Sequence, residues 1–140
     1  MLQRDPSKWM QKHNEHLHPN ETSFLKGLIG EDVACVYLVE LGYIVLKRRF
    51  KSRYGEIDII VRDVCRQELV FVEVKSRGRL RELTDEAVIT DRQIKRNIDA
   101  ATCFFMTHQV YDSYTGRFDL ITISSNKVVS HIKSAWDVIQ

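Results

Sequence analysis

Alternation of apolar and polar side chains marks one short strand around which the rest of the sequence can be arranged. The run 68–75 alternates from start to finish, which is typical of a β-strand. Val70, Val72 and Val74 face one side. The other side carries Leu69, Phe71, Glu73 and Lys75. This second side begins apolar and ends with an acid and a base whose Cα atoms lie roughly 6.5 Å apart. Charges at the end of an apolar strand are costly unless they are paired.

Patterns elsewhere in the chain predict two long helices and four more strands. Thr22 or Ser23 can cap a helix that extends to about Leu41, with Gly42 as its left-handed stop. Thr90-x-x-Gln93 has the form of a capping box and opens the second helix. The other strands are predicted over 43–50, 56–62, 117–124 and 128–133, and a short final helix over 134–140. The predicted fold class is therefore α/β, in the order α-β-β-β-α-β-β with a short C-terminal helix.

The first helix carries two neighbouring stripes of residues at helical spacing. The more apolar stripe consists of Leu25, Leu28, Ile29, Val33, Val36, Tyr37 and Leu41. The other stripe consists of Gly27, Gly30, Glu31, Ala34 and Leu38. Small residues there would let another element come close, with Glu31 at the contact. Glu31 is then either a surface carboxylate or an acid directed into a site, and helix geometry alone does not choose between them.

An aspartate interrupts the strand predicted over 56–62. Asp58 lies inside a run that otherwise reads as core, where aspartate is disfavoured. This strand and the next are close in sequence, so we expect them to pair as an antiparallel hairpin. In a suitable register, Asp58 lies beside Glu73. The alternative is an ordinary Glu73–Lys75 ion pair on an edge strand, with Asp58 as an acid at a turn.

Length and composition fit one globular domain. The chain has 140 residues, enough for a single sizeable core, and we assign 22–140 to it and 1–21 to a flexible polar N-terminal tail. No stretch approaches the ~18 apolar residues of a membrane span, and residues 1–20 lack the apolar region of a secretory signal. The three cysteines are far apart and odd in number, which predicts neither a disulfide framework nor a metal site and favours a reducing cytoplasm.

Basic residues gather beside the two strands that carry the acids. One cluster consists of Lys47, Arg48, Arg49, Lys51 and Arg53, and a second of Lys75, Arg77, Arg79 and Arg81. Arg92 and Lys95 add positive charge at the start of the second helix, whose N-terminus favours phosphate. Tyr54, next to the first cluster, is a candidate for stacking on an unpaired base. These patterns indicate a polyanionic partner, although solvated loops would look the same.

Converging carboxylates beside a lysine point to metal-assisted hydrolysis. Carboxylates that meet at one point repel one another and favour a divalent cation. Mg²⁺ commonly takes one or two carboxylates together with phosphate oxygens and water. It would neutralise a scissile phosphodiester and activate a water, while a nearby lysine would orient or deprotonate that water. The basic residues would hold the rest of the nucleic-acid backbone.

Several short motifs resemble a known group of nucleases. Gly30-Glu31, Gly55-Glu56-Ile57-Asp58 and Val72-Glu73-Val74-Lys75-Ser76-Arg77 resemble the metal-dependent nuclease superfamily with the PD-(D/E)xK signature. Together with Ala100-Ala101 and Arg117-Phe118-Asp119, they are more narrowly similar to the bacterial YraN-like family. That family is described as candidate endonucleases distantly similar to archaeal Holliday-junction resolvases. The resemblance covers about 23–137.

This resemblance implies a fold and a role for each matching residue. The fold would be a restriction-endonuclease-like mixed sheet flanked by helices. Asp58 and Glu73 would be metal ligands with the Val74 backbone carbonyl, and the metal would be Mg²⁺ or Mn²⁺. Lys75 would be the catalytic lysine, and Glu31 would hold a second metal or its water. Where many relatives carry a lysine early in the second helix, this chain has Gln93.

The glutamine at position 93 could bind a phosphate or a water, or it could serve only in the capping box. Arg92 or Lys95 would then supply the missing charge. For Asp119 we favour a structural salt link to Arg117, and we expect His131 on a strand surface.

Two functions follow as hypotheses. The first is a DNA endonuclease selective for branched or single-stranded DNA in recombination or repair. The second is a catalytically weak DNA-binding accessory module of a DNA-processing complex. The same chemistry would also serve RNA. A homodimer would suit the cutting of two strands, and a recombination or branch-migration motor is a further candidate partner.

Overall fold

A computed structural model describes residues 19–77 and 89–137, and side chains from residue 27 onward within these ranges. Residues 1–18 of the predicted tail 1–21 and the predicted DNA contacts Arg79 and Arg81 lie outside the described residues, and 19–21 belong to a helix. The described elements are α2 (Pro19–Glu40), β1 (Ile44–Lys51), β2 (Glu56–Asp63), β3 (Glu68–Arg77), α3 (Asp91–Thr107), η3 (Gln109–Tyr111), β4 (Thr115–Ser124) and β5 (Lys127–Trp136).

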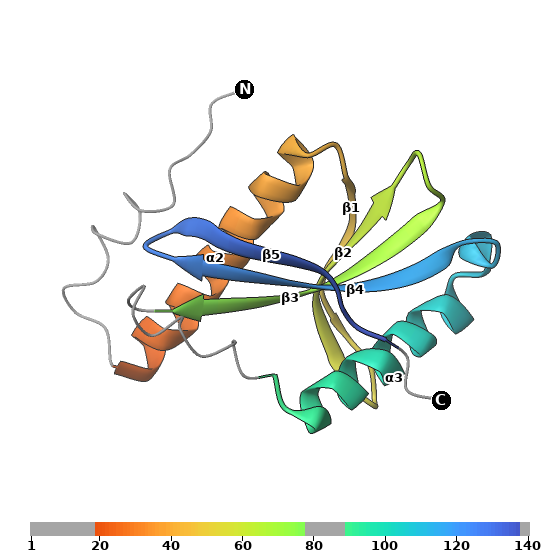
Figure 1. Ribbon diagram of the computed structural model, residues 1–140. Helices are drawn as coiled ribbons and strands as arrows, with labels where there is room; N and C mark the ends of the chain where they lie inside the picture. The colour runs from red at the N-terminus through yellow and green to blue at the C-terminus, as the bar shows by residue number, and fades with distance from the viewer. Residues whose placement is uncertain (1–18, 78–88, 138–140) are drawn as a thin grey trace.

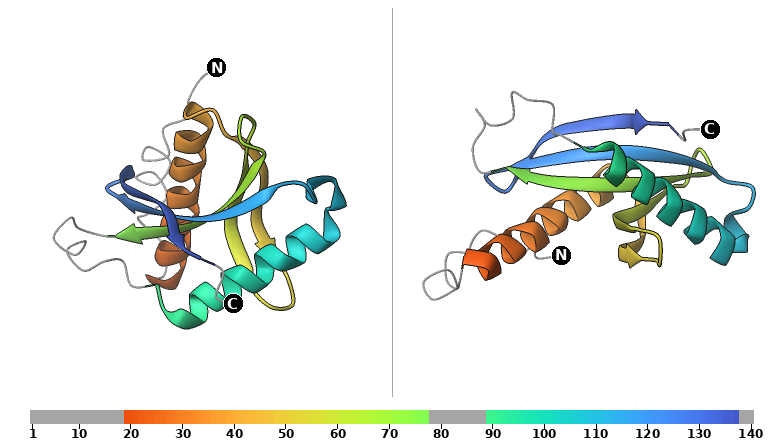
Figure 2. Two further views of the ribbon diagram at one scale, coloured as in Figure 1. Left: turned by 45° about the vertical axis from the view of Figure 1, so that its right-hand side comes forward. Right: turned by 90° about the horizontal axis from the view of Figure 1, so that it is seen from below.

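The strands form one mixed sheet in the order β1-β2-β3-β4-β5 (Figure 1). All neighbouring strands are antiparallel except β3 and β4, which run parallel and are connected through α3. Figure 2 shows β5 beside β4 at the edge of the sheet. The predicted α/β class and the order of helices and strands are confirmed. β3 is the central strand, so the Glu73–Lys75 pair does not lie on a sheet edge.

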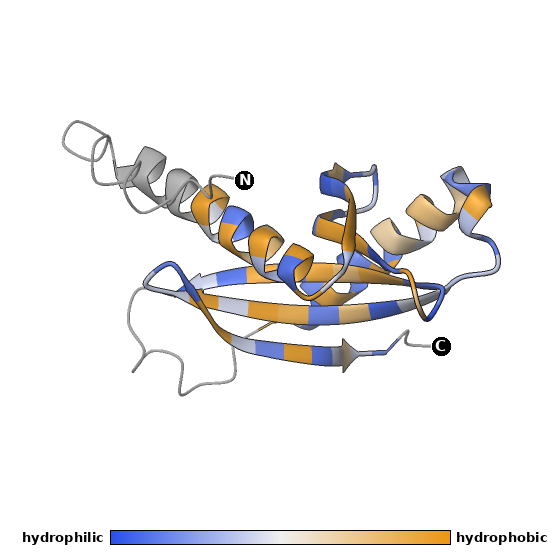
Figure 3. Cartoon of the chain, turned by 90° about the horizontal axis from the view of Figure 1, so that it is seen from above, coloured by the Kyte–Doolittle hydropathy of each residue, from blue (hydrophilic) through white to orange (hydrophobic). Residues whose placement is uncertain are grey.

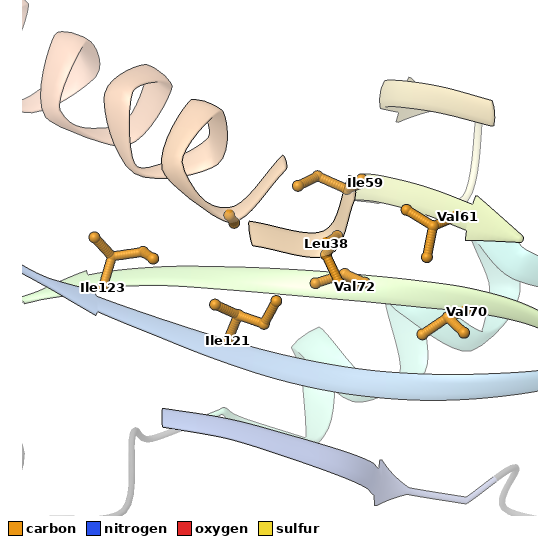
Figure 4. Close-up of a cluster of buried hydrophobic side chains, with 8 residues drawn as sticks. Leu38, Ile59, Val61, Val70, Val72, Ile121 and Ile123 are labelled. Carbon is orange, nitrogen blue, oxygen red and sulfur yellow. The ribbon is translucent and has the colours of Figure 1, made fainter. Parts of the chain in front are cut away.

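Two hydrophobic clusters lie on opposite faces of β3, as its alternation predicts. Val70 and Val72 join the cluster that includes Ala34 and Leu38 of α2. Figure 4 shows this cluster between α2 and the strands, with side chains contributed by β2, β3 and β4. On the other face, Leu69 and Phe71 pack in a second cluster against α3. Both faces of β3 are therefore covered, and its charged end emerges from a dry core.

The sheet-facing side of α2 is the stripe of small residues together with one edge of the apolar stripe, where Ile29 is buried. Ala34 and Leu38 are completely buried, whereas Val36 and Leu41 of the apolar stripe are about half exposed. Gly30 makes this possible, because a Cβ there would lie 2.1 Å from the Ser76 Oγ of β3. Apolar residues lie around much of the described part of α2 (Figure 3). The prediction that the small residues let another element come close is confirmed.

The two ends of α2 differ in how well the sequence located them. The helix begins at Pro19, earlier than the predicted cap at Thr22 or Ser23. Its end is as predicted: Gly42 has φ 97°. Tyr43 N–H donates to Leu38 O and Gly42 N–H to Val39 O, which is the Schellman arrangement.

The predicted C-terminal helix is wrong over its first residues. Ser134–Trp136 extend β5, whose pairing with β4 reaches Phe118↔Trp136. Trp136 stacks on Phe118 with ring centroids 5.8 Å apart, so this packing favours the extended conformation, and 138–140 lie outside the described residues. Within the described parts of the chain, no helix is long and apolar enough to span a membrane.

Candidate active site

Asp58 lies where β2 and β3 separate. Their regular pairing runs from Asp63↔Glu68 to Ile59↔Val72 and stops there. One residue further, the Asp58 carboxylate takes the place of the ladder, because the Val74 N–H donates to Asp58 Oδ2 at 2.8 Å. The predicted hairpin is thus confirmed, and its register brings Asp58 beside Glu73, with a direct side-chain interaction between the two acids.

Glu73 and Lys75 project from the same side of β3, as the alternation predicts. Lys75 Nζ lies 3.3 Å from Glu73 Oε1, and the two side chains are only 20% and 15% exposed. The Asn97 side chain, buried on α3, also hydrogen bonds to Glu73. The acid is therefore held from two sides, by an ammonium and by an amide.

The acids share a poorly solvated space that disfavours their charged forms. Burial, followed by repulsion from Asp58, raises the pKa of Glu73 to about 7. Burial also raises the pKa of Asp58, although the Val74 N–H bond opposes this shift. Carboxylates with raised pKa values lack sufficient positive charge nearby. One ammonium does not neutralise this group, which is the condition that a divalent cation relieves.

Glu31 approaches the pair from α2. Burial, followed by repulsion from Asp58, raises the pKa of Glu31 to about 7. Its Oε2 is buried and has no hydrogen-bond partner among the described residues, since Arg49 Nε at 4.0 Å is too distant for a hydrogen bond. The structure therefore favours an acid directed into the site over a surface carboxylate.

Two residues of the first basic cluster interact with acids of α2. Arg48 pairs with Asp32 at 2.6 Å, and Arg49 lies near Glu31. Arg49 has φ 52°, an unfavourable conformation for a residue with a side chain. It lies opposite Asp58, between the pairs Arg48↔Ile59 and Phe50↔Ile57. The remaining members, Lys47, Lys51 and Arg53, are exposed.

The start of α3 shows how Gln93 is used. Thr90 and Gln93 form the predicted capping box in both directions: Gln93 N–H donates to Thr90 Oγ1 and Thr90 N–H to Gln93 Oε1. Lys95 pairs with Asp99 and is 77% exposed, and Arg92 is exposed. The glutamine thus caps the helix, and Asn97, one turn later, is the α3 residue that reaches the acids.

The donor set fits a cation bound by two carboxylates. Among the described residues, no group of three His, Cys, Asp or Glu side chains is arranged to hold a metal ion. Mg²⁺ does not need such a group, because it usually keeps several waters and takes one or two carboxylates. Asp58 and Glu73, with their raised pKa values and direct contact, provide that set. Glu31 contributes charge next to Asp58.

Sequence reasoning missed the role of Asn97 and the burial of His131. Asn97 lies on the buried side of α3 with Ala100, Ala101 and Phe104, and a lone amide in that stripe was the available signal. On the α2 side of the sheet, Asp119 is fully buried. The prediction of a salt link to Arg117 is confirmed, with Nε–Oδ1 at 2.8 Å. His131 is not on the surface as predicted: its Nε2 lies 2.8 Å from Asp119 Oδ2 and its side chain is 7% exposed.

Comparison with known sequences matches one family over most of this site. Residues 30–123, which include Glu31, Asp58, Glu73 and Lys75, match the model of "Uncharacterised protein family UPF0102". The chain is 41% identical over 116 residues to a UPF0102 protein of Nitrobacter winogradskyi, covering 82% of this chain and 94% of the relative. It is 38% identical over 116 residues to a UPF0102 protein of Persephonella marina, covering 83% and 97%.

Proposed function

The chain belongs to the uncharacterised protein family UPF0102, and from its site we propose that it is a metal-dependent nuclease that hydrolyses phosphodiester bonds in DNA. The observation that supports this most is the buried Asp58–Glu73 pair beside Lys75 at the point where β2 and β3 separate. Buried like charges are costly, so a site that keeps them has a use for a cation. The nuclease-like resemblance of the motifs supports the same assignment.

Each residue has a task in this reaction. Asp58 and Glu73, with the Val74 carbonyl, would hold Mg²⁺ or Mn²⁺, which supplies neutralisation of the phosphodiester and activation of a water. The Val74 N–H keeps the Asp58 carboxylate in place. Lys75, fixed against Glu73, orients the attacking water and offsets the charge that develops on the phosphate. Asn97 restrains the Glu73 side chain.

The exposed basic residues would bind the DNA backbone. Lys47, Lys51 and Arg53 lie on β1 and on the turn that follows it, beside β2 with its Asp58. Arg77, half-buried at the end of β3, is two residues from Lys75. In the sequence, basic residues therefore precede Asp58 and follow Glu73. We propose branched or single-stranded DNA as the substrate, and a homodimer or a motor protein of recombination as partners.

A cleavage assay tests the proposal directly. Linear, flapped, single-stranded and four-way DNA are incubated with the full chain in Mg²⁺, Mn²⁺ or EDTA. We expect cutting only with metal. Glu73→Ala and Lys75→Ala should each reduce it by about a hundredfold or more, while DNA affinity measured in EDTA stays within about threefold. Glu56→Ala, an exposed acid on β2, is the matched control and should cut normally. Equal cutting by Glu73→Ala would remove the proposal.

A second candidate function is a DNA-binding accessory module with little cutting activity. The observation that favours it is the capping role of Gln93, a side chain that carries no positive charge for the phosphate. Lys95, which is 77% exposed, pairs with Asp99. DNA binding in EDTA without cleavage of any of the four substrates in either metal would support this module over the nuclease.

A further inference from the structure

Tyr54 differs from the other aromatic residues whose side chains the structure describes. Its side chain is 61% exposed, whereas each of the others is buried or half-buried. An aromatic ring in water is unfavourable, and an exposed ring is a frequent feature of sites that stack on a ligand. Most of the other rings pack in pairs, such as Phe71–Phe104 and Phe118–Trp136.

The turn that carries Tyr54 is fixed at several points. The Ser52 N–H donates to Gly55 O at 2.8 Å, and the Ser52 hydroxyl oxygen accepts from the N–H groups of Tyr54 and Gly55, each at 3.2 Å. Gly55 is buried against α3, because a Cβ there would lie 2.1 Å from Arg96 O. The ring is thus presented on a backbone held by both the turn and the helix, so stacking would require little ordering of this segment.

Tyr54 also has a cation beside its ring and the candidate site close by. The Arg53 guanidinium carbon lies 5.9 Å from the ring centroid. Tyr54 is four residues from Asp58, a length of chain that spans at most about 14 Å. A stacked nucleotide strand advances about 3.4 Å per nucleotide. A base on Tyr54 would therefore lie within about four nucleotides of a phosphate held at the acids.

We propose that Tyr54 and Arg53 form a stacking platform for one unpaired base of DNA within about four nucleotides of the scissile phosphate. Every base offers a π-face, so such a platform recognises lack of pairing rather than sequence. The bases inside a duplex are already stacked on both sides and cannot use it. Arg53 contacts the neighbouring phosphate. The identity of the ligand as DNA rests on the proposed function, and the platform adds the requirement for an unpaired nucleotide.

Fluorescence of a base analogue tests the platform without any cleavage. A single-stranded DNA with one 2-aminopurine is titrated with the full chain in EDTA, and the same DNA annealed to its complement serves as the paired probe. We expect the wild-type chain to quench the single-stranded probe, because stacking on a ring quenches this base. Tyr54→Ala should remove the quenching and weaken single-strand binding roughly fivefold to a hundredfold, while its duplex affinity changes less than about twofold.

Three further variants separate stacking from other roles of this side chain. Tyr54→Phe keeps the ring and should bind within about twofold of wild type. Tyr54→Leu keeps apolar bulk without the ring and should behave like Tyr54→Ala. Val64→Ala, at a similarly exposed apolar residue in the next turn, should change nothing. Equal losses on single-stranded and duplex DNA, or full binding by Tyr54→Leu, would overturn the platform, and a stronger Tyr54 dependence on the matching RNA would overturn the assignment to DNA.

The result of the fluorescence test can be distinguished from the result of the cleavage assay. Tyr54-dependent quenching in a chain that cuts none of the four substrates would leave the platform in place and remove the nuclease. Cutting that depends on Glu73, in a chain whose DNA binding does not depend on Tyr54, would support the nuclease and overturn the platform.

Discussion

At the residue scale, the acids of the site act against the stability of the metal-free chain at neutral pH. The pKa values of Glu31 and Glu73 rise to about 7 on folding, chiefly through burial. A carboxyl group whose pKa is raised in the folded state stabilises that state fully below its unfolded value of about 4.5, and this contribution is lost as pH rises through about 7. The folded chain without metal should therefore become less stable between these two pH values.

A metal-linked stability measurement checks this consequence. In EDTA, the free energy of unfolding should fall by on the order of 1–3 kcal/mol from pH 5 to pH 8, and Mn²⁺ at pH 8 should restore it, since it compensates the same charge. Glu73→Gln should be more stable than wild type at pH 8 in EDTA and should respond less to Mn²⁺. Urea unfolding measures both effects, with Glu56→Gln as control. A Glu73→Gln variant that follows wild type at each pH would contradict the prediction.

Arg49 carries a second residue-scale cost, located in the backbone. Its φ of 52° is unfavourable for any residue with a Cβ, by about 1–2 kcal/mol. Strain of this kind persists where a side chain is needed in one place, and here the side chain lies against Glu31.

Two variants of Arg49 separate the backbone from the guanidinium. Arg49→Ala and Arg49→Gly both remove the charge, but only glycine accepts the positive φ without strain. We expect the glycine variant to be more stable than the alanine variant by about 1 kcal/mol in urea unfolding. Equal stabilities would mean that the backbone relaxes once the guanidinium is gone, and that the strain comes from the contact with Glu31.

At the scale of elements, the close approach of a turn to α3 depends on glycine. Gly55 brings the β1–β2 turn against the Arg96 backbone of α3, and a backbone atom cannot rotate away as a side chain can. Gly55→Ala should therefore destabilise the chain by about 1–3 kcal/mol. A Cβ added at Gly27 of α2 would meet no atom within 4 Å, so Gly27→Ala, the matched control, should stabilise the helix by about 0.5–1 kcal/mol. Urea unfolding of both variants measures the difference, and equal effects would contradict it.

How far the sequence predicted each element depends on how local its signal is. The alternation of β3, the capping box at Thr90 and Gln93 and the stop at Gly42 are local, and the structure confirms all three. The small residues of α2 predicted a close approach by another element, which the position of Gly30 confirms, but no local pattern shows that this element is β3 with Ser76. The helix predicted for Ser134–Trp136 failed for the same reason, because pairing with β4 determines its conformation.

The candidate site was predictable to the same extent. The hairpin register placed Asp58 beside Glu73, since both strands and their short connection were readable. Asn97 and the approach of Arg49 to Glu31 were not readable, because each joins elements that are distant in sequence. The burial that raises the pKa values of the acids is likewise a property of the assembled fold.

At the scale of the whole molecule, one buried network ties α2 to β3, β4 and β5. Asp119 of β4 accepts hydrogen bonds from Arg117 and from the Ser134 N–H of β5, and it contacts His131. His131 in turn contacts the Tyr37 hydroxyl of α2 at 3.0 Å. Arg117 also reaches Glu68 of β3 at 2.9 Å. Burial alone would raise the pKa of Asp119, but His131 and Arg117 outweigh it and the pKa is lowered.

This network connects the element that carries Glu31 to the strand that carries Glu73 and Lys75. Because Asp119 is completely buried, it has no water to replace a lost partner. Removing one member of a buried charged group leaves the others uncompensated, which typically costs about 3–5 kcal/mol. The cost should therefore exceed that of losing an exposed ion pair by several fold.

Asp119→Asn tests this against an exposed pair in the same chain. The amide keeps the size of the side chain but takes from Arg117 one of its two charged partners, the other being Glu68, and leaves His131 without its carboxylate. We therefore expect the free energy of unfolding to fall by about 3–5 kcal/mol. Asp99→Asn breaks the Lys95 pair, which is largely exposed, and should change it by less than about 0.5 kcal/mol. Urea unfolding at pH 7 measures both. A similar small loss in both variants would mean that packing of the hydrophobic cluster around Ala34 and Leu38, and not this network, fixes α2 on the sheet.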